Sequence, residues 1–278
     1  YPLSAPHTGP IGVFDSGYGG LTILGKFIER LHSTITCTWE IMPVLHTAHV
    51  RSNVYDFTLQ AVKKLFELGC PLVILACNTA SAKALRSIQQ NDLPHMDPTR
   101  RVLGSDTPTV ECIGENHPQR ARSLLATAGT VTPESYPLEI KKIFPDIQVT
   151  GMAAHVVPLV ENKEYDGDGA DYFVKKYIDT ILQKDPDIDT LILGCTHYPL
   201  LLQKIRQYTP SHIRLVTQGE YVSESLKDYL SRHPDMDARC SKNKRREFLT
   251  TESVEKFRES ASVFLHCTNV HVRNVQLE

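Results

Sequence analysis

Two cysteines, Cys77 and Cys195, stand in matching contexts that suit proton-transfer or nucleophilic chemistry. Each follows a run rich in branched apolar residues, at 72–76 and at 190–194, and each precedes polar residues that can cap a helix. This pattern is typical of a buried strand that ends at the cysteine, with a helix beginning just after it. Because a helix N-terminus favours negative charge, both sulfurs are candidates for thiolate formation near working pH.

A single cysteine after a strand is more often a small packed hydrophobe than a reactive group. Two cysteines in the same context favour the chemical interpretation. A metal site at Cys195 and His197 lacks further ligands at a recognisable spacing. The seven cysteines have scattered spacings and form no C-x-x-C pair, which argues against a disulfide framework and a structural zinc site. We therefore predict free thiols in a reducing compartment.

A glycine-rich turn follows the first apolar run of the chain. Asp15 and Ser16 precede Gly17, Gly19 and Gly20, and glycines let the backbone approach an anion at the start of the next helix. The spacing differs from the G-x-G-x-x-G of dinucleotide-binding proteins, and no Walker-type lysine follows. A substrate carboxylate fits this turn as well as a nucleotide does, and Asp15 could also act only as a helix N-cap.

The elements that must position these residues are strands and helices in alternation. Short apolar runs alternate with amphipathic helical patterns, which predicts an α/β fold with mainly parallel sheets flanked by helices. The same strand–cysteine feature in both halves predicts two pseudo-symmetric domains with the active site in the cleft between them. We expect residues 1–106 and 220–278 to form the first domain and residues 107–219 the second. Ligands of such sheets bind at the carboxyl ends of the strands, where both cysteines lie.

The composition is that of an ordinary globular protein. The chain has 278 residues, of which 41% are hydrophobic and 22% charged, and a formal net charge of −2. This balance gives no sign of a nucleic-acid or anionic-membrane partner. The sequence has no apolar run long enough for a membrane span and no signal-peptide pattern at its start, so we expect a cytoplasmic protein.

With these residues assembled, the chain resembles the glutamate racemase family of the cofactor-independent aspartate/glutamate racemase superfamily. The resemblance extends to about residue 229, and the last fifty or so residues look like a lineage-specific extension. In that tail the patterns indicate helices around 226–230 and 252–264, with an exposed loop at 237–246. The motifs that carry the resemblance are Gly12-Val13-Phe14-Asp15-Ser16-Gly17-Tyr18-Gly19-Gly20-Leu21, Ala76-Cys77-Asn78-Thr79-Ala80, Val157-Pro158-Leu159-Val160-Glu161 and Leu193-Gly194-Cys195-Thr196-His197-Tyr198-Pro199-Leu200.

The resemblance implies an isomerase that interconverts L- and D-glutamate and supplies D-glutamate for peptidoglycan. Inversion at one carbon needs two monoprotic bases on opposite faces, which two strand ends facing a cleft could supply. By resemblance, Cys77 acts on D-glutamate and Cys195 on L-glutamate. No pyridoxal phosphate, metal or nucleotide is implied, and a homodimer is expected. The supporting catalytic residues would be Asp15, Glu161 and His197, and the substrate-binding residues Asp15, Ser16, Asn78, Thr79, Thr196 and His197.

One segment departs from the family pattern. Where the family carries a motif like Gly-Asp-Asn-Ala-Arg-Ala-Pro-Tyr-Gly, this chain reads differently from Trp39 to Val50. If the gene is read in a shifted frame, each new codon consists of the last base of one codon and the first two bases of the next. Codon choices exist for which this shifted frame encodes the missing motif. We therefore hypothesise that residues 32–53 are an out-of-frame translation, which resequencing of the gene would test.

Three other functions stay open from the sequence. The first is a related racemase for aspartate or a similar amino acid, which an assay of both substrates would separate. The second is an inactive paralogue or binding protein, which becomes more attractive if the segment 32–53 is genuine. The third is a nucleotide-binding α/β protein, although the glycine spacing does not fit one.

Overall fold

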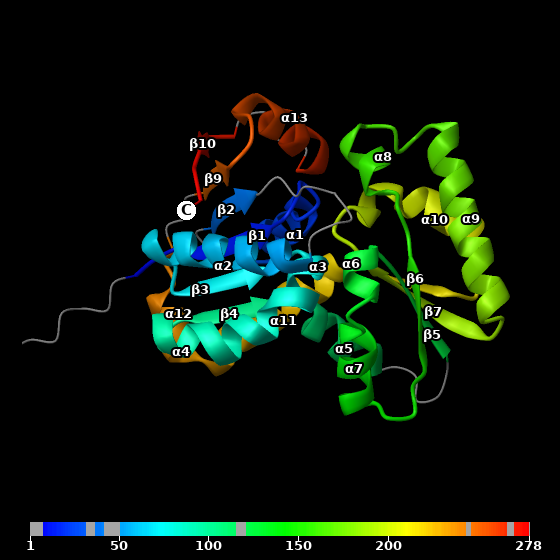
Figure 1. The fold of residues 1–278 in the computed structure, drawn as a ribbon, viewed down its shortest axis with the longest axis horizontal. Coiled ribbons are helices and arrows are strands. Elements are labelled where there is room, and N and C mark those ends of the chain that lie inside the picture. The colour runs from blue at the N-terminus through cyan, green and yellow to red at the C-terminus, as the bar shows by residue number, and fades with distance from the viewer. Residues whose placement is uncertain are drawn as a thin grey trace, which may run out of the picture.

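The apolar runs of the sequence form two parallel sheets (Figure 1). The structure, a computed structural model, describes residues 8–31, 37–41, 51–114, 121–242, 246–265 and 270–277. Within these ranges one sheet has the order β10-β9-β2-β1-β3-β4 and the other the order β6-β5-β7-β8. The first sheet contains β1 (Ile11–Asp15), β2 (Cys37–Ile41), β3 (Leu72–Leu75), β4 (Arg101–Gly104), β9 (Arg246–Thr250) and β10 (Val272–Asn274), and the second β5 (Ala121–Ala126), β6 (Val149–Ala153), β7 (Ile188–Gly194) and β8 (Arg214–Val216).

Helices cover both sheets, as the alternation in the sequence predicts, and the expected α/β fold class is confirmed. Every strand pair among the described residues runs parallel. The helices near the first sheet are α1 (Leu21–Arg30), α2 (Arg51–Glu67), α3 (Asn78–Ala80), α4 (Leu93–Met96), α11 (Gln218–Arg232), α12 (Pro234–Arg239) and α13 (Val254–Phe264), with π-helical turns at Ser81–Leu85 and Ile88–Asp92. Those near the second are α5 (Asp106–Gly114), α6 (Ala128–Val131), α7 (Ser135–Ile143), α8 (Val157–Glu161), α9 (Asp168–Lys184) and α10 (Leu202–Tyr208), with a 3-10 turn at Tyr198–Leu201.

Helix α1 shows how the sequence places the glycine-rich turn. Leu21, Leu24 and Phe27 recur at helical spacing and are buried against the first sheet. Burying such a side chain stabilises the fold by about 1.5–3 kcal/mol. The helix therefore begins at a fixed point directly behind β1, and the turn between them has little freedom to move.

The chain passes between the two sheets twice. It leaves the first sheet after β4 through α5, and it returns from β8 through α11. Val222, Leu226 and Leu230 of α11 belong to the hydrophobic core of the first sheet, together with side chains of α1. The two crossings lie side by side at the junction between the sheets (Figure 1). The domain boundaries predicted at 106/107 and 219/220 fall at these crossings and stay a prediction.

The tail is not an extension appended to the fold. Strand β9 pairs with β2, and β10 pairs with β9, so both complete the first sheet. Phe248, Leu249 and Val272 are buried there, which accounts for the apolar residues of these short strands. The expected exposed loop at 237–246 was also wrong in part, because α12 ends inside it and β9 begins at its last residue.

The hypothetical out-of-frame segment, residues 32–53, lies largely outside the described residues. Its described part is strand β2, which pairs with β1 and β9, and the first residues of α2. The hypothesis itself concerns the gene and stays a prediction. In the described part of the chain, no helix combines the length and the apolar character that a membrane crossing requires.

Candidate active site

The carboxyl ends of β1, β3 and β7 present the residues that the sequence singles out. Asp15 is the last residue of β1, Cys77 comes two residues after β3, and Cys195 comes directly after β7. All three are buried, with at most 6% of their surface exposed. Figure 1 shows the helices α3 and α6 in the space where these strand ends meet. The topology therefore brings together residues from both halves of the chain.

Cys77 lies at the start of α3, as predicted. Its sulfur accepts a hydrogen bond from the backbone N–H of Ala80 at 3.4 Å, so the side chain caps the helix. The hydroxyl of Ser16 lies 2.9 Å from the same sulfur. Burial, with the nearby carboxyl of Asp15, nevertheless raises the pKa of the Cys77 thiol to about 12. The protonated thiol is therefore the resting form on this side of the site.

Asp15 connects the two halves of the site. Its Oδ2 accepts a hydrogen bond from the backbone N–H of Gly20 and another from the Thr196 hydroxyl at 3.2 Å, while Oδ1 accepts from the N–H of Ser16 at 2.9 Å. Burial raises the pKa of the Asp15 carboxyl, and the charge of His197 and these hydrogen bonds act in the opposite direction. Asp15 is thus more than the helix N-cap that the sequence left as an alternative.

Cys195 has a different companion. Its sulfur lies 3.8 Å from Nδ1 of His197, and Nε2 of the same ring lies 3.0 Å from Oε1 of Glu161. Burial alone would lower the pKa of His197, but the hydrogen bonds and charge interactions with Cys195 and Glu161 together outweigh it and raise the pKa to about 10. A protonated imidazole therefore places a positive charge beside this sulfur.

The helical segment that follows Cys195 does not begin at the cysteine itself. A turn at 196–197 follows β7, and the 3-10 turn then begins at Tyr198 with Pro199 in its first positions. No side chain caps that turn. The thiol therefore gains its electrostatic support from a neighbouring imidazole rather than from a helix end, which is the main difference from Cys77.

The glycines of the turn after β1 are required by close contact. A Cβ atom on Gly17 would come within 2.9 Å of Oε1 of Glu161, and one on Gly19 would overlap Nδ1 of His197 and lie 2.5 Å from the Thr196 hydroxyl. These neighbours belong to the other half of the chain. The turn is therefore packed directly against the Cys195 side of the site.

The remaining predicted binding residues, Asn78 and Thr79, occupy different surroundings. The Asn78 amide is buried and exchanges hydrogen bonds with Gln218, while the Thr79 hydroxyl lies 2.9 Å from that of Thr127 and 3.2 Å from that of Thr130. Sequence reasoning did not single out Gln218, Thr127 or Thr130. For Thr127 a usable signal existed, because it follows β5 just as the other site residues follow their strands.

The tail also reaches this region, which the sequence did not indicate. The Tyr18 hydroxyl in the glycine-rich turn donates a hydrogen bond to Oε2 of Glu252 at 2.5 Å. The ring of Phe264, at the end of α13, packs edge-on against His197 with ring centres 5.9 Å apart. Helix α13 and the residues before it therefore hold the turn on one side and the imidazole on the other.

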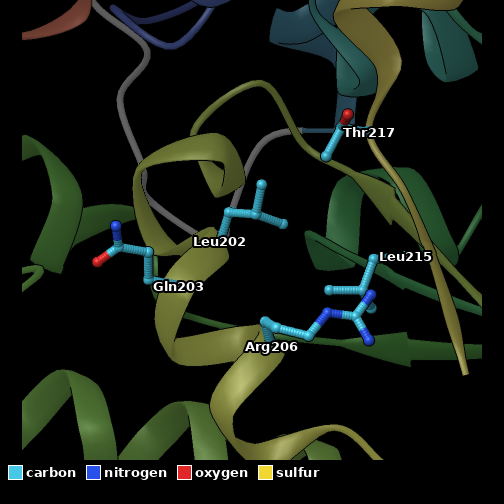
Figure 2. A pocket seen from close by; sticks show the side chains of 5 residues that line it. All are labelled: Leu202, Gln203, Arg206, Leu215 and Thr217. Atoms are coloured by element: carbon cyan, nitrogen blue, oxygen red, sulfur yellow. The ribbon is translucent and has the colours of Figure 1, made fainter. Parts of the chain in front are cut away.

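Among the described residues, no group of three or more His, Cys, Asp or Glu side chains could hold a metal ion. A shallow pocket of about 460 Å³ lies along α10 and β8, where Arg206 reaches toward Leu215 (Figure 2). None of the residues predicted for the site lines that pocket.

Comparisons with known proteins agree with the geometry. No family model matches the chain. It is 35% identical over 278 residues to a glutamate racemase of Roseobacter denitrificans, with 92% of this chain and 96% of that one covered. Its fold is similar to that of a glutamate racemase of Bacillus anthracis (TM-score 0.86, 26% identity) and of one from Francisella tularensis solved with D-glutamate (TM-score 0.84, 27% identity). Both matches cover 98% of each chain, so they include the tail.

Proposed function

The chain belongs to the glutamate racemase family, and from this premise we propose that Cys77 and Cys195 carry the two proton transfers that interconvert L- and D-glutamate. The enzyme is an isomerase that works without pyridoxal phosphate, and its family role is to supply D-glutamate for the cell wall. In the L-to-D direction the thiolate of Cys195 removes the α-proton, and the thiol of Cys77 delivers a proton to the opposite face. In the reverse direction the two cysteines exchange roles.

The observation that carries this assignment is the connection through Asp15. This carboxyl lies against the Cys77 thiol and accepts a hydrogen bond from Thr196, the neighbour of Cys195. The surroundings of the two cysteines, which come from opposite halves of the chain, are thus linked through one carboxyl. Two monoprotic groups on opposite faces of one carbon are what inversion requires.

The charges on the two sides support distinct duties. A thiol whose pKa is about 12 holds its proton at neutral pH and is a strong base once it has lost it. His197, which is protonated below about pH 10, supports the opposite sulfur, and Glu161 holds the imidazole in place. Asp15 acts in the opposite sense on Cys77, because a carboxyl beside this sulfur favours the protonated thiol. We infer that the resting enzyme has a thiol at Cys77 and a protonated imidazole beside Cys195.

Substrate binding is assigned to the small polar residues that flank the two cysteines. Ser16, Asn78, Thr79 and Thr196, together with Asp15 and His197, would bind the two carboxylates and the ammonium group of glutamate. Their hydroxyl and amide groups lie next to the strand ends, and the backbone N–H groups of the glycine-rich turn add donors for an anion. Glutamate is the expected small-molecule partner.

The direct test is racemisation by the purified chain in deuterated water. We expect deuterium to enter the α-position of the product from either enantiomer of glutamate, and Cys77→Ala and Cys195→Ala to abolish turnover. The same assay with L- and D-aspartate separates a related racemase from this one. A chain that exchanges no α-proton would be a binding protein or an inactive paralogue. The predicted homodimer and cytoplasmic location are tested separately, by light scattering and cell fractionation.

A further inference from the structure

Four buried polar side chains from four helices meet directly behind Cys77. They are Asn78 at the start of α3, Thr109 in α5, Tyr136 in α7 and Gln218 at the start of α11, and each is at most 3% exposed. Helices α5 and α11 are the two crossings between the sheets, which lie next to α3 in Figure 1. The cluster therefore connects the residue next to Cys77 with both crossings and with a helix of the second sheet.

The hydrogen bonds converge on two side-chain amides. Nδ2 of Asn78 donates to Oε1 of Gln218 at 2.5 Å, and Nε2 of Gln218 donates back to Oδ1 of Asn78 at 2.8 Å. Nε2 of Gln218 is also within bonding distance of the Thr109 hydroxyl, at 3.1 Å, and of the Tyr136 hydroxyl. The Tyr136 hydroxyl in turn donates to Oδ1 of Asn78 at 2.6 Å.

This pattern fixes the orientation of the Asn78 amide. Its oxygen accepts from both Gln218 and Tyr136, so the amide plane is held from two directions. The Nδ2 group carries two protons, and the bond to Gln218 uses one of them. Among the described residues, no acceptor is bonded to the other proton. Because unmade hydrogen bonds are costly in a buried environment, rotation of the amide away from this position is disfavoured.

If the cluster served only to hold α5 and α11 together, it would not need Asn78. Its inclusion of Asn78 links it to α3, the helix that Cys77 caps. Resting on the function proposed above, we propose that Gln218 is a positioning residue for racemisation, which holds the Asn78 amide so that its second N–H meets a carboxylate of glutamate. Gln218 touches no reacting atom in this scheme. It acts through Asn78, and Tyr136 assists it.

The test compares Gln218→Met with Ser223→Ala. Methionine has a similar shape but can make none of the amide bonds, so Asn78 loses its main partner. Ser223 lies on the same helix, is also buried, and donates its hydroxyl hydrogen bond to the carbonyl oxygen of Glu220 at 2.8 Å rather than to a residue of the cluster. We expect Gln218→Met to raise KM about tenfold for both enantiomers with a smaller change in kcat, since a ground-state contact is lost. Ser223→Ala should lower Tm and leave KM unchanged.

A second measurement reads the amide without turnover. The side-chain amide signals of Asn78 in ¹⁵N NMR spectra, assigned by their loss in Asn78→Asp, should shift in Gln218→Met and stay in place in Ser223→Ala. If the wild-type chain fails to racemise glutamate, the proposed function falls, and these signals still decide whether Gln218 orients Asn78. Unmoved signals, or a KM equal to that of Ser223→Ala, would overturn the inference.

Tyr136→Phe provides a milder variant in case Gln218→Met does not fold. It removes one of the two donors to the Asn78 oxygen, and we expect KM to rise severalfold. Where Gln218→Met does fold, the double variant Gln218→Met/Tyr136→Phe gives a further test. The two factors by which KM rises should combine to less than their product, because both substitutions release the same amide. A Tyr136→Phe enzyme with the wild-type KM, or effects that multiply fully, would contradict the proposal.

Discussion

The two halves of the site start from the same sequence pattern and end in opposite electrostatic surroundings. Cys77 caps a helix but lies beside a carboxyl, and its pKa is raised to about 12. Cys195 lacks the helix but lies beside an imidazole that keeps its proton to about pH 10. A repeated strand–cysteine motif therefore determines where the sulfurs are, while the residues around each motif determine which charge lies beside each sulfur.

This asymmetry is limited by thermodynamics. Two enantiomers have equal free energy in water, so the equilibrium constant of racemisation is one and kcat/KM must be equal in both directions. Different surroundings of the two cysteines can change kcat and KM separately for each enantiomer but not this ratio. The difference between the two cysteines should therefore be visible in the rate of a single proton transfer, in the reactivity of each thiol, or in the stability of the fold.

Removing one sulfur at a time should reduce activity more than any other change. We expect Cys77→Ala and Cys195→Ala each to lower racemisation by about 10²–10⁴-fold or more, because each removes a group that must accept or donate a proton. Any α-proton exchange that survives should be limited to L-glutamate in Cys77→Ala and to D-glutamate in Cys195→Ala. Exchange of both enantiomers by a single-cysteine variant would show that another group serves as the second base.

The contact between the halves is tested next, through Gly19→Ala. The new methyl group would overlap His197 and press on the Thr196 hydroxyl, so the Cys195 side must move away from the glycine-rich turn. A displacement of about 1 Å in a catalytic group can lower the rate by about 100-fold. The activity of the purified variant measures the effect.

Gly25→Ala is the matched control for Gly19→Ala. Gly25 lies inside α1, and its nearest Cβ contact would be at 3.5 Å from a Leu265 side chain, an ordinary separation. We expect full activity and a gain of about 0.5–1 kcal/mol in stability, since alanine suits a helix better. Equal loss of activity in both variants would mean that any change near α1 disturbs the enzyme, regardless of His197.

Alkylation by iodoacetamide compares the two sulfurs directly. At pH 8 a thiol with a pKa of about 12 is almost wholly protonated, so Cys77 should react about 10–100 times more slowly than an ordinary surface cysteine. The charge on His197 should make Cys195 the faster of the two. Peptide mapping by mass spectrometry measures both rates in one sample. His197→Asn should slow Cys195 and leave Cys77 unchanged, and equal rates in the wild-type enzyme would refute the asymmetry.

The smallest expected effect is on stability as a function of pH. The folded state raises the pKa of His197 from 6.5 to about 10, so the protonated ring stabilises the fold fully below pH 6.5 and loses this contribution as the pH rises through 10. Wild type should therefore exceed His197→Asn by about 1–3 kcal/mol near pH 6, with the gap closing toward pH 10. Urea unfolding at several pH values measures it, and a constant gap would argue against a protonated His197.

By the same reasoning, the contribution of Cys77 to stability is lost over a different pH range. Its pKa rises from 9.0 to about 12 on folding, so its contribution is present below pH 9 and is lost only between pH 9 and 12. Cys77→Ala should consequently track the wild-type pH dependence up to about pH 9. The two halves of the site would then be distinguishable by the pH at which each one weakens the fold.

The sequence predicted the strand ends well because each follows a continuous apolar run. The runs at 72–76 and 190–194 became β3 and β7, and the residues after them lie at the site. What it could not predict depends on contacts distant in the chain. The carboxyl of Asp15 meets Thr196, and Gln218 meets Asn78, through the packing of the two sheets. The local hydrophobic periodicity of the sequence carries no information about such long-range contacts.

The tail was misjudged for a related reason. Arg246 and Glu247 open β9 with charges, and the apolar part of the strand is short, so its pattern does not differ from a loop. These residues form a strand because they pair with the edge of β2. Likewise, nothing near Phe264 in the sequence indicates that its ring packs on His197. Local patterns therefore identify the core strands and the cysteines, and tertiary packing decides the edges and the supporting residues.

The position of β9 between β2 and β10 has a consequence for synthesis on the ribosome. Cys37–Ile41 leaves the exit tunnel long before Arg246–Thr250, a delay of roughly 10–40 s at about 5–20 residues per second. Throughout that interval the nascent chain exposes an unpaired strand edge, the kind of surface on which polypeptides aggregate. The half that begins first is thus the last to be completed, because its sheet gains β9 and β10 only when translation ends.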